Sequence, residues 1–210
     1  MNRTIKLLMI SDIFLVTGFG LIDPILAIFI KENLIGGSIF AAGFASTLFL
    51  VTKSIVQLPF SKYVDSHDDK VKWLIVGTFL ISMVPFLYVF AKDIYLIYLA
   101  QVLYGVGAGF ASPTWLGLWT THLDKKHESF EWSIYSTSVG LGIAVTALIG
   151  ATIAEYVDFS YSFVLTGIMA LVGCTILLTL EKQEEEKRKL KSMETENYHS
   201  RRKLMHKKHH

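Results

Sequence analysis

Long, nearly uninterrupted blocks of apolar residues are the feature of this sequence that most constrains its fold. The blocks are about 19 to 25 residues long, enough for a helix to cross the roughly 30 Å hydrocarbon core of a bilayer. Inside a bilayer, each such segment must satisfy its own backbone polar groups, which a helix does. The sequence therefore predicts an all-α membrane protein that crosses the bilayer several times.

The apolar blocks define six spans. We expect them at about residues 5–30, 37–60, 73–91, 94–117, 132–155 and 160–180. Residues 1–180 would then form a six-helix transmembrane domain. Residues 181–210 contain ten Lys or Arg and six Asp or Glu, and for them we expect a charged cytoplasmic tail that is helical at first and disordered beyond about Glu194.

Basic residues alternate between the two sides of the predicted membrane. One side holds seven in its short segments and the other holds Lys31 and Lys92; the seven are Arg3, Lys6, Lys62, Lys70, Lys72, Lys125 and Lys126. Because the side richer in Lys and Arg faces the cytoplasm, both termini are predicted there. The chain is thus expected to be a multi-pass protein of the cell or inner membrane.

The first and fourth spans share a local pattern. Gly18-x-Gly20-x-x-x-Pro24 is matched by Gly107-x-Gly109-x-x-x-Pro113. With three spans in each unit, the second unit would run opposite to the first, as in the inverted repeats of many secondary transporters. The sequence therefore predicts a 3+3 inverted repeat; the alternative is a chance similarity between two glycine-rich segments.

Small residues also recur at helical spacing in two spans. Gly105 and Gly109 lie in the fourth span, and Gly142, Thr146 and Gly150 follow one another every four residues in the fifth. Small side chains allow two helix backbones to approach closely in a membrane. We interpret all five as helix-packing residues.

Two carboxylates lie within the first apolar block. Asp12 and Asp23 are eleven residues apart, about 20° past three full turns, so they share one helix face at different depths. A charge near a helix centre costs roughly 2.5–3.5 kcal/mol on insertion scales, so this face should meet the bundle interior or a water-filled cavity. Lys53 in the second span matches Asp12 in depth, and the two either form an ion pair or extend separately to the interface.

Asp23 has no basic residue at its depth and directly precedes Pro24, where we expect a kink. A carboxylate of this kind could bind a proton or a cationic substrate. The alternative is that Asp23 lies near enough to the outer interface to remain hydrated. Its role therefore depends on whether a cavity reaches it.

A more specific pattern follows the second span. The segment QLPFSKYVDSHDDKVK (residues 57–72) resembles the cytoplasmic loop signature of the major facilitator superfamily, between helices two and three. Asp65 and Lys70 match the signature, whereas Ser61, Ser66, Asp68 and Asp69 depart from it. The resemblance implies that Asp65 and Lys70 belong to a gating loop that joins the two halves of a transporter.

Other segments resemble the same family, in the branch of drug:proton antiporters. GFGLIDPILAIFI (residues 18–30) is similar to its first helix, and the fifth span keeps two positions, Gly142 and Gly150, of the antiporter signature. In the fourth span, Gln101 replaces an arginine that the family often uses in proton coupling. The resemblance covers about residues 5–180 and corresponds to the N-terminal six-helix half of that fold.

The resemblance implies a half-sized secondary transporter of small molecules that works with ion or proton coupling and exports cationic or amphipathic compounds. Its candidate substrate or proton-binding residues are Asp23, Asp12, Lys53 and Gln101. One half alone would expose its cavity face, so we expect a homodimer or a second half-transporter chain as partner. The alternatives are a non-transporting assembly or regulatory protein of the membrane, and a truncated fragment of a full-length transporter.

Enzymatic functions find no support in the sequence. No Ser/His/Asp arrangement, metal-ligand spacing or phosphate-binding loop is recognisable. The predicted partners are the lipid bilayer and a small-molecule substrate, without nucleic acid, metal or cofactor.

Overall fold

The computed structural model describes residues 2–67, 69–123 and 126–207, which form seven helices and no strand. The helices are α1 (Arg3–Gly20), α2 (Leu26–Asn33), α3 (Ile39–Ser66), α4 (Lys70–Val89), α5 (Ile94–His122), α6 (Glu128–Tyr156) and α7 (Phe159–Lys207). Five helical segments are long and apolar enough to cross a membrane: α3, α4, α5, α6 and the Phe159–Glu186 part of α7. The predicted all-α membrane fold is confirmed.

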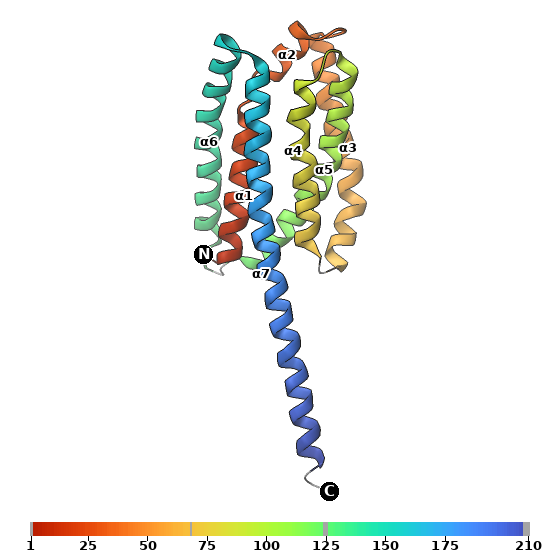
Figure 1. Ribbon diagram of the computed structural model, residues 1–210, viewed down its shortest axis with the longest axis vertical. Coiled ribbons are helices and arrows are strands. Elements are labelled where there is room, and N and C mark those ends of the chain that lie inside the picture. Colours follow the sequence, from red (N-terminus) through yellow and green to blue (C-terminus); the bar gives the residue numbers. More distant parts are fainter. Residues whose placement is uncertain (1, 68, 124–125, 208–210) are drawn as a thin grey trace.

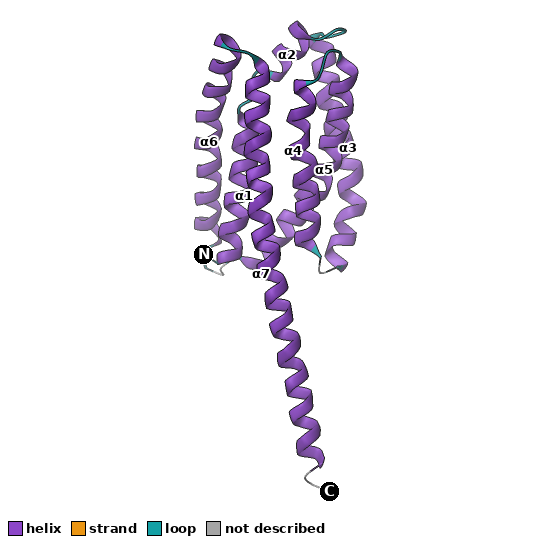
Figure 2. Ribbon diagram, viewed as in Figure 1, coloured by secondary structure: helices purple, strands orange, loops and turns teal. Residues whose placement is uncertain are grey.

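The long helices pack side by side in one bundle (Figures 1 and 2). Helix α5 packs against α3 and α4, α4 packs against α7, and α1 packs against α7 and α6. The N-terminus lies at the end of the bundle from which α7 extends, here called the terminal end, and α2 lies at the opposite end (Figure 1). The ends of α3 and α5 and the starts of α4 and α6 also lie at the terminal end (Figure 1).

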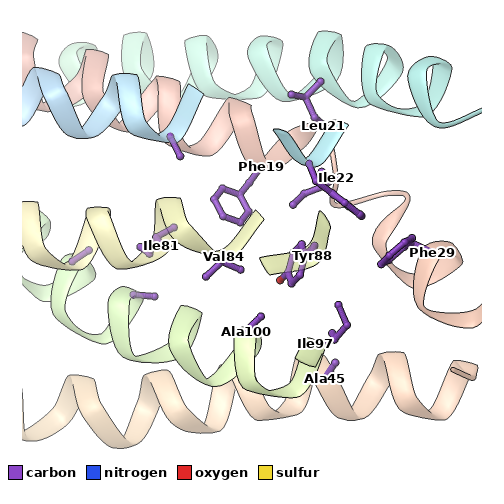
Figure 3. Close-up of a cluster of buried hydrophobic side chains, with 14 of the residues drawn as sticks. Phe19, Leu21, Ile22, Phe29, Ala45, Ile81, Val84, Tyr88, Ile97 and Ala100 are labelled. Atoms are coloured by element: carbon purple, nitrogen blue, oxygen red, sulfur yellow. The ribbon is translucent and has the colours of Figure 1, made fainter. Parts of the chain in front are cut away.

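Apolar side chains fill the centre of the bundle. Figure 3 shows Ile81, Val84 and Tyr88 of α4 between Phe19 of α1 and Ile97 of α5, and each of these side chains is buried. Burying such side chains against one another excludes water and packs the helices at close range. The centre of the bundle is therefore solid apart from the cavities described below.

The first predicted span, residues 5–30, is two helices in the structure rather than one. Helix α1 ends at Gly20, a turn occupies residues 21–25, and α2 begins at Leu26. Pro24 has no amide hydrogen to donate to the carbonyl of Gly20, and its ring hinders continuation of the helix. The kink expected beside Asp23 is therefore a full break, which the apolar composition does not reveal.

The C-terminal tail also differs from the expectation of disorder beyond about Glu194. Helix α7 continues without interruption to Lys207, and residues 181–207 contain neither Gly nor Pro and are rich in Glu, Lys and Arg. These residue types favour a helix even when it is fully solvated. At the base of this extension, Lys72 Nζ lies 4.0 Å from Glu185 Oε1, and the Thr4 hydroxyl donates to Glu184 at 3.4 Å.

The glycines of α5 and α6 lie where helices approach most closely. A Cβ atom at Gly105 would lie 2.8 Å from the Phe49 carbonyl oxygen of α3, and one at Gly109 would lie 2.7 Å from Val56 Cβ. On α6, a Cβ at Gly150 would overlap the Leu21 backbone, one at Gly142 would overlap the Thr17 side chain, and Thr146 contacts α1 at Gly20. Side chains larger than these would push α3 away from α5, and α6 away from α1.

We predict that Gly150→Ala destabilises the protein, because the new methyl group meets backbone atoms of Leu21 that cannot move aside. Overpacking of this kind costs about 1–3 kcal/mol. The matched control is Gly140→Ala on the same helix, since a Cβ there has nothing within 4 Å. Thermal unfolding in detergent should show a lower midpoint for Gly150→Ala alone, and equal midpoints for the two variants would contradict this packing.

Candidate functional site

A cavity of about 350 Å³ lies among α1, α3, α4 and α5 on the side of the bundle toward the terminal end. Its lining includes Asp12, Asp23 and Lys53, together with Tyr104 and Trp115. The structure thus brings three of the four predicted binding residues to one cavity. Two carboxylates and one ammonium group line it, so its formal charge is negative when all three are ionised.

A second cavity, of about 450 Å³, lies toward the α2 end of the bundle. Asp23 lines this cavity too, together with Gln101 and Tyr88. The Gln101 side-chain amide donates to the Tyr88 hydroxyl at 3.1 Å, and both side chains are buried. Among the described residues no Lys, Arg or His lines the second cavity, so Asp23 carries its only formal charge there.

Asp23 owes its position to the break between α1 and α2. Its amide donates to the Phe19 carbonyl at 3.0 Å, and Leu26 donates to Ile22 at 2.9 Å, so the chain turns tightly around it. The side chain is exposed and lines both cavities. The break therefore presents the carboxylate to both cavities.

Asp12 has a partner that sequence reasoning missed. The hydroxyl of Tyr135, on α6, donates a hydrogen bond to the Asp12 carboxylate. Within the described part of the chain, Asp12 and Lys53 form no ion pair at 4.0 Å or less, although both line the first cavity. Depth along the helices is a signal that could have indicated Tyr135. Asp12 and Tyr135 lie at similar distances from the first residues of α1 and α6, respectively.

Tyr135 belongs to a cluster of aromatic rings at the terminal end. The rings of Trp115 and Trp119 stack at 5.0 Å between centroids, and Tyr135 lies 5.2 Å from Trp115 and 5.4 Å from Trp132. Trp115 also lines the first cavity. The cluster thus covers the Asp12 end of that cavity with apolar rings.

The two candidate gating residues lie at the terminal end as well. Asp65 is an exposed residue in the last turn of α3, and Lys70 is the first residue of α4. Lys70 Nζ approaches α5, where it would lie 3.8 Å from a Cβ at Gly117. Asp68 of the same loop and Lys125 lie outside the described residues.

These features define a class: an integral membrane bundle with charged cavities between its spanning helices. Residues 8–208 match the sequence profile of the Major Facilitator Superfamily. The chain belongs to this superfamily. This is a family of membrane transporters rather than of enzymes.

Several known transporters share distant sequence similarity with this chain. Multidrug resistance protein 1 of Bacillus subtilis is 23% identical over 92% of this chain and 50% of its own length. A Na⁺, Li⁺, K⁺/H⁺ antiporter of Planococcus maritimus is 22% identical over 88% and 43%. The quinolone resistance protein NorA of Staphylococcus aureus is 23% identical over 85% and 46%. The chain spans about half the length of these relatives.

A solved structure shares the fold. The crystal structure of an auto inhibited peptide transporter of the POT family superposes with a TM-score of 0.71 and 14% sequence identity. The match covers 86% of this chain and 37% of the peptide transporter. The arrangement of helices described above is thus one that occurs within a larger transporter.

We predict that the Tyr135–Asp12 hydrogen bond couples α6 to α1. In a double-mutant cycle of Tyr135→Phe and Asp12→Asn, the two effects on unfolding free energy should fail to add, by about 0.5–3 kcal/mol. Reversible unfolding in mixed micelles measures this coupling. Tyr156→Phe serves as the control because Tyr156 is 82% exposed, and additive effects in the cycle would disprove the contact.

Proposed function

We propose that this chain forms one wall of an ion- or proton-coupled exporter of small cationic or amphipathic molecules. The observation that carries the proposal is the place of Asp23, which lines both cavities at a break in the first span. A carboxylate within a membrane bundle is retained at a cost, and it suits the binding of a proton or a cation. Relatives whose names record multidrug resistance, quinolone resistance and cation/H⁺ antiport support this substrate class.

The other predicted residues take roles within the same proposal. Asp12 and Lys53 give the first cavity its remaining charges, and Gln101 supplies a neutral polar group to the second. Asp65 and Lys70 serve as the gating loop of the terminal end. We also propose that this end faces the cytoplasm, because the short segments rich in Lys and Arg lie there.

The six spans form a 3+3 inverted repeat in this proposal. When α1 is exchanged with α5, α3 with α6 and α4 with α7, the α3–α5 and α4–α5 contacts map onto the α1–α6 and α1–α7 contacts, and the α4–α7 contact maps onto itself. The matched glycines agree: Gly18 contacts α7 and Gly107 contacts α4, while Gly20 contacts α6 and Gly109 contacts α3. These are the contacts expected when the two shared motifs occupy equivalent places.

A second six-helix unit supplies the other wall of the path. The long apolar helices α3 and α6 are only 17% and 6% buried over their most apolar stretches, and the relatives are about twice as long as this chain. We propose that a second copy of the chain fills this place when the chain is purified alone. Native mass spectrometry in mild detergent should then show a discrete dimer that survives dilution, and a monomer at every concentration would exclude self-association.

The central test of the proposal is transport by the Asp23→Asn variant. Purified protein in proteoliposomes with an imposed pH gradient should move the fluorescent cation ethidium, and Asp23→Asn should reduce this movement to background because it removes the exchangeable carboxyl group. The matched control is Asp158→Asn. Asp158 lies between α6 and α7, and hydrogen bonds from the side chain and backbone of Ser160 hold its pKa below the usual value.

The carboxylate of Asp158 is ionised but lines neither cavity. The Asp158→Asn variant should therefore transport ethidium as well as the unmodified protein does. Undiminished, gradient-dependent transport by Asp23→Asn would contradict the assignment of Asp23. Monodisperse elution of each variant from a sizing column establishes that the protein is folded.

A further inference from the structure

The two cavities meet along a short line of side chains. Among the described residues, only Phe19, Asp23, Phe49 and Tyr104 line both. Three of these four are aromatic, and they come from α1, α3 and α5. The remaining lining residues of each cavity belong to that cavity alone.

The three aromatic rings are in direct contact. The ring of Tyr104 stacks against Phe19 with centroids 4.9 Å apart and planes at 27°, and its centroid lies 4.3 Å from that of Phe49. The rings therefore form a continuous row from α1 through α5 to α3. This row lies between the first cavity, which contains Ser112 and Trp115, and the second, which contains Ser46 and Gln101.

The backbone beneath each ring is fixed by a close helix contact. A Cβ at Gly105, next to Tyr104, would lie 2.8 Å from the carbonyl oxygen of Phe49, so α5 and α3 meet directly behind two of the rings. Phe19 lies between Gly18, which contacts α7, and Gly20, which contacts α6. All three aromatic residues thus lie in closely packed helices rather than in loops.

We infer that Phe19, Phe49 and Tyr104 form an aromatic partition that divides the transport path into two compartments, with Asp23 as the charged group common to both. The inference rests on the proposed function in so far as the cavities are a transport path. It also predicts that two classes of transported species pass between the compartments in different ways. A proton or small cation can pass from one compartment to the other at Asp23 while the rings stay packed, whereas a larger solute must displace a ring.

Cysteine accessibility tests the partition without a known substrate. Cys174 is the only cysteine in the sequence and is buried, so Cys174→Ala gives a background without thiols. In that background, Ser112→Cys reports on the first compartment and Ser46→Cys on the second. A membrane-impermeant maleimide, added to either side of sealed membrane vesicles, should label these two positions from opposite sides.

Removal of a ring should join the compartments. With Phe49→Ala added, each reporter cysteine should react from both sides, and Tyr104→Leu provides a second variant that keeps an apolar side chain should Phe49→Ala misfold. The control is Phe44→Ala, which removes an exposed ring of α3 that contacts the half-buried Tyr98 of α5 and should leave the labelling pattern unchanged.

Two results would overturn the partition. The first is labelling of both reporter cysteines from the same single side while all three rings are present. The second is an unchanged one-sided pattern in folded Phe49→Ala and Tyr104→Leu. Since labelling needs neither ethidium nor a pH gradient, failure of the transport test would leave this result intact, and the two proposals can fail separately.

Discussion

A carboxylate within the first long apolar block is the constraint on which the rest of the structure depends. Placing Asp23 there costs roughly 2.5–3.5 kcal/mol on insertion scales unless polar surroundings or water receive it. The break at Pro24 supplies such surroundings, because it ends α1 at Gly20 and turns the chain toward two cavities. If the first span were one straight helix, residues 26–33 would continue along the axis of α1. The break instead allows them to pack against α3 as α2.

Close packing elsewhere makes this break possible. The contacts of Gly150 with Leu21, just after α1, and of Gly105 with α3 bring backbones together on both sides of the cavities. Small residues are enriched where membrane helices pack, because close van der Waals contact must replace the hydrophobic driving force that lipid does not offer. The same contacts position Phe19, Phe49 and Tyr104, so the packing of the bundle also determines the shape of the two cavities.

How far the sequence predicts this arrangement depends on whether a feature is local. Asp12 and Asp23 both line the first cavity, but the helical spacing that predicts a shared face does not explain this, because α1 ends at Gly20 before Asp23 is reached. Local spacing does not reveal the partner of Asp12, because Tyr135 lies 123 residues away, and a comparison of depths selects Tyr135 only once α1 and α6 are known to be neighbours. The contacts among Phe19, Phe49 and Tyr104 cannot be predicted from the sequence for a related reason: these look like ordinary apolar residues until three helices are brought together.

The most direct test of the central claim, that Asp23 is an exchangeable carboxyl group reached from within the membrane, is labelling with dicyclohexylcarbodiimide. This apolar reagent modifies carboxyl groups inside membranes, and peptide mass spectrometry reports each carboxylate separately. The structure predicts modification of Asp23 that excess tetraphenylphosphonium suppresses, while the solvent-exposed Asp158 stays unmodified. An Asp23 that the reagent leaves untouched, or whose modification the cation does not affect, would contradict the claim.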